Sequence, residues 1–432
     1  MAGGLLFNAV LLWLYHHPEP KVLFGDENYY FQLARSLAAG RDVAHNPIWP
    51  SLYASLIAIL FRWTGTAVLT VQLLQIVMWL ASAALLFLIS LHISRIPGVA
   101  LAAMGIFLFS PEVAAFSHYL WPEIPHMFFF LAALWVLIRR GRTLLGSFAG
   151  GVLIGLALWS KLILLPFLPA FMVFLHPGRS ILRHWKAVSL FAAGVLLVLT
   201  PTMLSNAKTH DRFMVADSSV FNLWVGLNDV ETQDFRNDIA PHEFIRYRKA
   251  APDFATRNEI YRQKIKGLVR DRGLAKTLGN QLAKQYFRLF DHDSFFTTQL
   301  PGGPRSSYKF REGAVSSGLR LYSHAFHALL LAAGAVGLAR LRVLRLDWPQ
   351  FLALLLLFNL ALFLFVHVKT RYLMQLVPVF AFFGATALHA GWCRIRGTEV
   401  PPDGNFRSTP GRLAAGLALL LFAEWLAFAS LL

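Results

Sequence analysis

The sequence contains few charged residues and almost no cysteine. Only 15% of its 432 residues are Asp, Glu, Lys or Arg, against roughly 25% in an ordinary globular domain. Cys393 is the single cysteine, so no intramolecular disulfide can form. The chain does not open with a charged segment followed by a small-residue cleavage site, so we expect no cleavable signal peptide. These absences argue against a soluble domain and against a disulfide-stapled one.

Apolar residues make up 56% of the chain, and the mean hydropathy is +0.52. Several apolar runs approach the roughly 20 residues that span a bilayer as a helix. The composition therefore predicts an all-α polytopic membrane protein. The formal net charge of +17 comes without a nucleic-acid-binding motif. We attribute it to cytoplasmic loops and contacts with anionic membrane lipids, and expect no nucleic-acid partner.

The distribution of positive charge predicts the topology. The segment 47–64 is short for a span, and if it lies on the membrane, all the basic loops fall on one side together with Arg95. We then expect the N-terminus inside, the C-terminus outside and eleven spans in an inner (plasma) membrane protein. The basic loops are 139–142, 179–186, 340–345 and 394–412. The predicted spans are 3–16, 67–92, 98–117, 122–138, 145–160, 162–176, 187–204, 320–339, 349–366, 371–392 and 412–432.

This topology divides the chain into three parts: a membrane module over 1–204 with a first outer loop at 16–66, a long outer loop over 205–318, and C-terminal spans over 319–432. Residues 28–39 predict a helix on the membrane surface that ends at Gly40. Within the long loop, 257–290 predicts two amphipathic helices broken at Gly273, because apolar residues recur every four positions from Leu274 to Phe290. The segment 301–304 predicts a turn-rich connector back to the membrane.

The adjacent carboxylates Asp26 and Glu27 lie just past the first apolar segment. A carboxylate at the membrane surface can act as a general base if it is ionised and within reach of the substrate. The alternative is a helix N-cap or an ion pair with Arg35. Neighbouring helical residues point in different directions, so we expect only one of the pair to face a substrate.

Further charged candidates lie at span ends on the same outer side. Glu123, between Pro122 and Pro125, is a second acid, or else a carboxylate favoured by the helix dipole. Lys161, Lys369 and Arg371 either extend from the membrane toward water or neutralise a phosphate. Two acids and three cations on one face favour a phosphate-handling site.

The fifteen His residues show no HExxH or close-paired ligand spacing. A contribution to a metal site from His16, His17, His118 or His126 stays open, but interfacial His is commoner. The first outer loop has no D-x-D sequence, and Asp291-His292-Asp293 is interpreted as a polar turn. We therefore predict no metal site and no certain cofactor, while a divalent metal stays open.

With these residues in view, the chain resembles the GT-C superfamily of membrane glycosyltransferases, and within it the group containing protein O-mannosyltransferases and the lipid A aminoarabinose transferase. The similar segments follow one another in the family's order from about residue 25 to 380. They are Gly25-Asp26-Glu27-x-x-Tyr30-x-x-x-Ala34-Arg35; Asn46-Pro47-Ile48-Trp49-Pro50-Ser51-Leu52-Tyr53; Ser110-Pro111 with Trp121-Pro122-Glu123; Gly155-Leu156-Ala157-Leu158-Trp159-Ser160-Lys161; Thr200-Pro201 to Asn206; Arg212-Phe213; Asn222-Leu223-Trp224-Val225-Gly226-Leu227-Asn228; and Arg371-Tyr372 with Pro378.

The resemblance implies a GT-C fold and an inverting transfer of a sugar from a polyprenyl-phosphate donor on the outer face. Asp26 would activate the acceptor hydroxyl, with Glu27 and Glu123 as further catalytic candidates. The implied donor-phosphate ligands are Lys161, Arg371, Lys284, Arg288 and Lys369. The expected substrate groove includes Tyr30, Tyr53, Asn222 and Tyr372. The chain departs from the family pattern at Ser205 and Leu227 and lacks a large C-terminal soluble domain, so the acceptor can be a glycan, a lipid or a protein.

Two other functions stay open: a transferase that uses a polyprenyl-pyrophosphate donor, and a transporter or flippase of lipid-linked sugars. A transporter is expected to place functional charges near the bilayer midplane, on broken helices in paired halves. Here the candidate charges lie at one surface, which favours the enzyme.

Overall fold

A computed structural model of the chain describes residues 1–41, 48–175, 184–228, 240–291, 293–342, 347–399 and 406–407, without the side chains of 240, 241 and 283–287. Within these ranges, every element longer than one isolated bridge, Leu341 to Phe406, is a helix. The predicted span 412–432 lies outside the described residues. The all-α architecture expected from the sequence is confirmed.

Four helical segments are long and apolar enough to cross a membrane: α4 (Val68–Ser94), α10 (Trp185–His210), α16 (Ala314–Ala339) and the continuous segment Thr370–Ile395. That segment comprises the 3-10 helix η4 (Thr370–Leu376) and α18 (Val377–Ile395). Shorter apolar helices are α1 (Ala2–His16), α3 (Leu52–Thr64), α5 (Pro97–Leu108), α8 (Leu144–Ser160) and α17 (Trp348–Phe363). The chain is a polytopic membrane protein, and eleven spans stays a prediction.

Prolines interrupt two of the predicted spans. The span 98–117 becomes α5 and the short α6 (Pro111–Phe116), because Pro111 disfavours helical geometry at Ser110, which instead caps α6. The span 162–176 begins as a 3-10 helix, η1 (Leu162–Phe167), with Pro166 inside it, and continues as α9 (Leu168–Phe174). The span 122–138 corresponds to α7 (Glu123–Arg140). These interruptions place helix ends beside the polar residues described below.

Glycine allows two helix pairs to pack with their backbones in contact. A Cβ atom at Gly151 of α8 would lie 2.1 Å from the Phe191 carbonyl oxygen of α10. A Cβ at Gly337 of α16 would lie 1.8 Å from the Phe383 carbonyl oxygen of α18. No side chain fits at either position, so these contacts fix the helices that carry the site.

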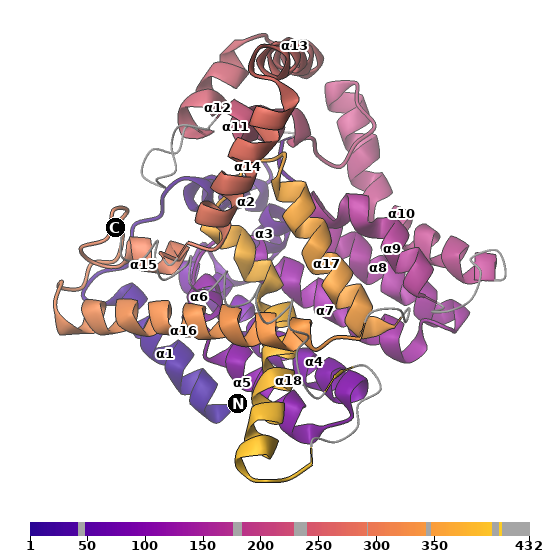
Figure 1. Ribbon diagram of the computed structural model, residues 1–432. Coiled ribbons are helices and arrows are strands. Elements are labelled where there is room, and N and C mark those ends of the chain that lie inside the picture. Colours follow the sequence, from indigo (N-terminus) through magenta and orange to yellow (C-terminus); the bar gives the residue numbers. More distant parts are fainter. Residues whose placement is uncertain are drawn as a thin grey trace.

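The long outer loop forms a helical cap with its own small core. It contains α11 (Ser219–Asn228), α12 (Ala240–Lys249), α13 (Phe254–Arg272) and α14 (Leu274–Leu289), with Gly273 at φ 84° between α13 and α14, where the sequence predicts the break. Figure 1 shows α12 and α13 at one end of the molecule, above α2 (Asp26–Ala38) and α3, and α14 running back toward α15 (Phe295–Gln299) and α16. Ile48 of the first loop is buried in the same core as Phe221 and Tyr247. The cap and the first loop are therefore packed together.

Candidate active site

A cavity of about 730 Å³ lies where the first loop, the cap and several helix ends meet. Its polar lining includes Asp26, Glu123, Lys161, Lys369 and Arg371. Asp26 begins α2, Glu123 begins α7, Lys161 follows α8, and Lys369 and Arg371 lie at the start of η4. The fold thus brings together, in one cavity, five charged residues that the sequence placed on the outer side.

Arg371 holds Asp26 through one carboxylate oxygen. Its Nη1 and Nη2 both lie 3.2 Å from Asp26 Oδ2. The Asp26 side chain is 38% exposed and that of Arg371 14%. Oδ1 of Asp26 has no protein partner among the described residues. The carboxylate is therefore fixed by one oxygen and open to the cavity through the other.

Aromatic rings fix the plane of the Arg371 guanidinium. Its Cζ lies 4.3 Å from the ring centroid of Trp121 and 5.6 Å from that of Tyr372. The Tyr372 ring in turn stacks on Phe363, at 5.5 Å and an interplanar angle of 7°. An Arg held between rings presents its donors in a constant direction, which suits recognition of a planar or tetrahedral anion.

Glu123 and Lys161 form a second ion pair beside the first. Lys161 Nζ lies 3.1 Å from Glu123 Oε1, and the side chains are 20% and 4% exposed. Burial lowers the pKa of Lys161, while attraction to Glu123 opposes that change. Glu123 Oε2 is buried without a hydrogen-bond partner among the described residues. The carboxylate therefore holds Lys161 through Oε1, while the hydrogen-bonding capacity of Oε2 is not used by any described protein group.

The structure does not bring Glu27 into the cavity. Its Oε2 lies 2.5 Å from Lys21 Nζ, both side chains are fully buried, and its Oε1 accepts from Leu120 N at 3.3 Å. Lys21 Nζ also lies 4.4 Å from the ring centroid of Tyr119. Burial raises the pKa of Glu27 and lowers that of Lys21, while their mutual attraction opposes both shifts. Glu27 therefore ties the start of α2 to the segment before α7.

The remaining predicted site residues divide between the cavity and its surroundings. Tyr30, Asn222 and Tyr372 line the cavity, and Asn222 O accepts from His367 N at 3.0 Å. The Tyr53 hydroxyl instead donates to Gln75 Oε1 at 3.0 Å, although its ring packs on Tyr30. Arg288 is buried in α14 and is not among the described lining residues. The side chain of Lys284 lies outside the described part of the chain.

Several residues that line the cavity are not among those expected from the sequence. They are Trp49, Asp217, Phe244, Arg248 and His367. Trp49 lies inside the Asn46-to-Tyr53 segment, and His367 lies four residues before Arg371, so proximity to the motifs was a usable signal. Phe244 and Arg248 lie on α12, and no local pattern indicates that this helix covers the cavity.

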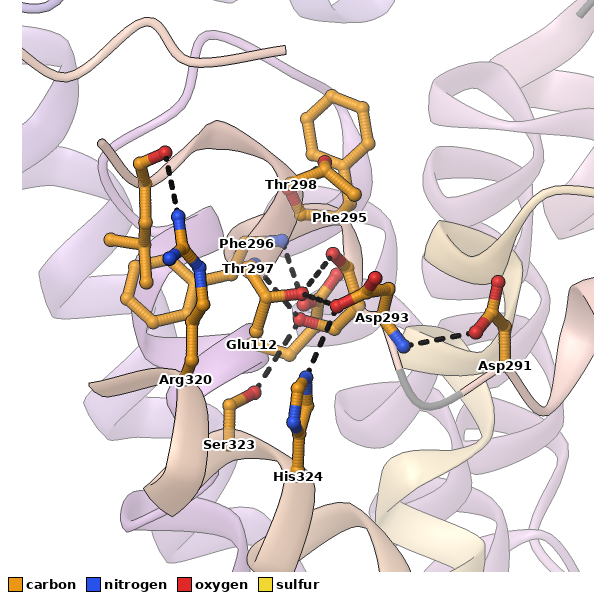
Figure 2. A network of polar contacts seen from close by, with 12 residues as sticks. Glu112, Asp291, Asp293, Phe295, Phe296, Thr297, Thr298, Arg320, Ser323 and His324 are labelled. Atoms are coloured by element: carbon orange, nitrogen blue, oxygen red, sulfur yellow. Dashed lines mark hydrogen bonds and ion pairs between the residues drawn. The ribbon is translucent and has the colours of Figure 1, made fainter. Parts of the chain in front are cut away.

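A separate polar network stabilises the return from the outer loop to the membrane (Figure 2). Asp293 Oδ1 accepts from Thr297 Oγ1 and from His324 Nε2, each at 3.1 Å, and Asp291 Oδ1 accepts from Asp293 N at 3.0 Å. Glu112 Oε2 accepts from Phe296 N at 3.1 Å. These contacts join 293–297 to α6 and α16.

No group of three His, Cys, Asp or Glu side chains suited to a metal ion occurs in the described part of the chain. Three of the histidines considered above bond to neighbouring protein groups. His16 donates to Gln72 Oε1 at 2.7 Å, His118 to Asn8 Oδ1 at 2.9 Å, and His126 to Ala157 O at 2.9 Å. These contacts join α1 to α4, the segment before α7 to α1, and α7 to α8.

The structure thus defines an all-helical, multi-pass membrane protein with two acid–base pairs in one cavity. Among solved structures it is similar to ArnT from Cupriavidus metallidurans bound to undecaprenyl phosphate, with 14% identity and a TM-score of 0.40, over 91% of this chain and 79% of ArnT. It is also similar to the apo oligosaccharyltransferase of Archaeoglobus fulgidus, with 16% identity and a TM-score of 0.45, over 97% of this chain and 54% of that one.

A further similar structure is AglB from the same archaeon, in complex with an inhibitory peptide and a dolichol-phosphate, with 13% identity and a TM-score of 0.46 over 98% of this chain and 54% of AglB. The chain therefore spans about half the length of the archaeal enzymes. No family model matches the sequence, and no curated protein matches it at the significance threshold.

Proposed function

We propose that the protein transfers a sugar from a polyprenyl-phosphate donor to an acceptor hydroxyl, with inversion at the anomeric carbon. The observation that carries this proposal is that one cavity is lined by a partly exposed carboxylate, by fixed cations and by a wall of apolar side chains. The resemblance of the ordered sequence motifs to GT-C glycosyltransferases supports the same reaction. The site would face the extracytoplasmic side of an inner membrane, as the charge distribution predicts.

Asp26 is the proposed general base. Arg371 engages Oδ2, while the Asp26 side chain lines the cavity and is 38% exposed. A base must be ionised and within hydrogen-bond reach of the hydroxyl that it deprotonates. Asp26 would take the acceptor proton as the hydroxyl oxygen attacks the anomeric carbon, and Glu123 would support the site by holding Lys161 in place.

Lys161, Lys369 and Arg371 are the proposed ligands of the donor phosphate. As the bond from the sugar to the phosphate breaks, a second negative charge develops on the polyprenyl phosphate that leaves. Fixed positive charge aimed at that oxygen stabilises the transition state. The leaving group is stabilised in this way without protonation by a general acid.

The net charge of the cavity favours a phosphate over a pyrophosphate donor. Around the proposed donor phosphate, its described lining contains three Lys or Arg side chains (Lys161, Lys369, Arg371) and two Asp or Glu side chains (Asp26, Glu123), which gives a net charge of +1. A polyprenyl-phosphate sugar is a phosphodiester with a single negative charge, whereas the pyrophosphate equivalent carries two. The single surplus cation matches the first.

An apolar wall beside these cations suits the lipid chain of the donor. Leu162, Ile163, Leu165 and Pro166 come from η1, and Leu362, Phe363 and Val366 come from the end of α17 and the residues after it. Leu165 is 44% exposed. The wall begins next to Lys161, so a phosphate at Lys161 would leave its attached prenyl chain against these side chains, where burial of apolar surface contributes to binding.

The test is to supply purified wild-type protein with a panel of polyprenyl-phosphate sugars and a cell-envelope extract as acceptor, and to measure released polyprenyl phosphate. We expect release from one donor of the panel, which names the sugar. A transporter would leave every donor chemically intact. Release only from polyprenyl-pyrophosphate donors would contradict the charge argument.

A further inference from the structure

Part of the cavity lining is aromatic. Trp49 packs against Tyr29 on one side, at 5.3 Å between ring centroids, and against Phe244 on the other, at 5.1 Å. Phe244 continues the row to Phe221 at 5.5 Å. All four rings line the cavity, and Trp49 and Phe244 are only partly buried. The fold therefore joins an aromatic surface from the first loop to one from the cap.

Polar and charged groups accompany this row of rings. The exposed Arg248 guanidinium lies 5.9 Å from the Phe244 ring centroid. Asp217 and Ser218 line the cavity just before α11. Flat rings beside hydroxyl, carboxylate and guanidinium groups match a sugar, which offers an apolar ring face and a rim of hydroxyls.

The cap that carries Phe244 and Arg248 is strongly basic. From 240 to 272 it contains nine Lys or Arg residues and four Asp or Glu residues, a net charge of +5. Positive charge normally collects on the cytoplasmic side of membrane proteins, yet the proposed topology places this cap outside. A positive surface at the mouth of a cavity attracts anionic ligands and speeds their association.

The described residues offer no strand edge on which an extended peptide could pair its backbone. Peptides bound along a groove commonly pair their backbone with an exposed strand edge. The described part of this chain has no strand. Beside the aromatic rings, the cavity is lined by residues of α11 and α12, whose backbone groups bond within the helices. Recognition here must come from side chains.

We propose that the acceptor is an anionic saccharide, whose ring lies against Trp49 and Phe244 and whose acidic group pairs with Arg248. This inference rests on the proposed function and names the class of acceptor that the aromatic part of the cavity would bind. The acceptor hydroxyl would then lie at Asp26, in the same cavity as the donor phosphate at Lys161 and Arg371.

The test measures binding rather than transfer. Purified protein in detergent is first saturated with undecaprenyl phosphate, so that the donor cations are occupied, and is then titrated with glucose 6-phosphate or with glucose. We expect glucose 6-phosphate to bind about tenfold more tightly than glucose, with an affinity that falls as salt rises, because charge-assisted contacts discriminate by about this much.

Three variants separate the contacts. Trp49→Ala should weaken the binding of both sugars, and Trp49→Phe should restore it, because stacking needs only a ring face. Arg248→Gln should abolish the preference for the phosphate. Arg262→Gln is the matched control, since Arg262 is an exposed cation of the same cap that pairs with Glu259 at 3.6 Å, and it should keep the preference.

Three results would overturn the inference. They are equal binding of the two sugars, a preference for glucose 6-phosphate that is retained in Arg248→Gln, and binding of a Ser-containing peptide by a protein that binds neither sugar. None of these depends on turnover. If no donor releases polyprenyl phosphate, the proposed function fails by itself, and the sugar titration still reports on this surface.

Discussion

At the scale of single residues, the most informative comparison is between Asp26 and Glu27. Successive residues on a helix point in directions about 100° apart, so these neighbours have different surroundings. Asp26 faces the cavity, and Glu27 is buried against Lys21. The sequence predicted that only one of the two faces a substrate, but the choice depends on Lys21 and Leu120, which no local pattern connects to Glu27.

Glu27 should contribute to stability rather than to chemistry. Glu27→Gln leaves the buried Lys21 ammonium without its counter-charge, and breaking a buried ion pair in this way costs about 3–5 kcal/mol. We expect a clear fall in the thermal unfolding temperature in detergent. The double variant Lys21→Met with Glu27→Leu removes both charges, and its unfolding temperature should return much of the way to that of wild type. An unchanged unfolding temperature in Glu27→Gln would contradict the assigned role.

The pH dependence of donor binding should report on Lys161. Its ammonium must be protonated to attract phosphate, and burial places its pKa below the ordinary value of 10.5. Binding is therefore complete below the lowered pKa and lost as the pH rises through it, earlier than for an exposed lysine. In Lys161→Arg the guanidinium stays charged, so alkaline binding of a polyprenyl-phosphate sugar should persist. Identical alkaline profiles for the two proteins would exclude Lys161 as a phosphate ligand.

At the scale of helices, most elements could be predicted from the sequence, but the way in which some of them begin could not. The surface helix 28–39 corresponds to α2, and the break at Gly273 is where φ is positive. Apolar periodicity and glycine determine these features locally. The 3-10 starts at η1 and η4 were not predicted, although they position Lys161 and Arg371. The Asp26–Arg371 contact joins residues 345 apart, so only the packed helices reveal it.

The α8–α10 contact should be intolerant of any side chain at Gly151. In Gly151→Ala the new Cβ meets the Phe191 backbone, so the helices must separate, at a cost of about 1–3 kcal/mol. We expect a lower unfolding temperature and weaker donor turnover, because α8 carries Lys161 at its end.

The control is Gly105→Ala in α5, where an added Cβ meets nothing within 4 Å among the described residues. Alanine also has the higher helix propensity, so this variant should be neutral or slightly stabilising. If the two alanine variants unfold at the same temperature, the close approach of α8 and α10 at Gly151 does not contribute to the stability of the protein.

At the scale of the whole molecule, the account requires the basic loops and the basic cap to lie on opposite sides of the membrane. Cys393 is buried and is the single cysteine, so Cys393→Ser gives a background for labelling. Arg142 and Arg262 are both exposed in the structure. In intact cells, a membrane-impermeant maleimide should label Arg262→Cys and should reach Arg142→Cys only after the membrane is opened. Labelling of both positions in intact cells would contradict the topology.

The central claim is that Asp26 deprotonates the acceptor within this cavity, and the most direct test is polyprenyl phosphate release by Asp26→Asn beside wild type. The isosteric amide keeps the shape of the side chain and removes the base. We predict a loss of about 10²–10⁴-fold in the rate of release, with donor binding retained. Equal release by the two proteins would remove Asp26 from this role.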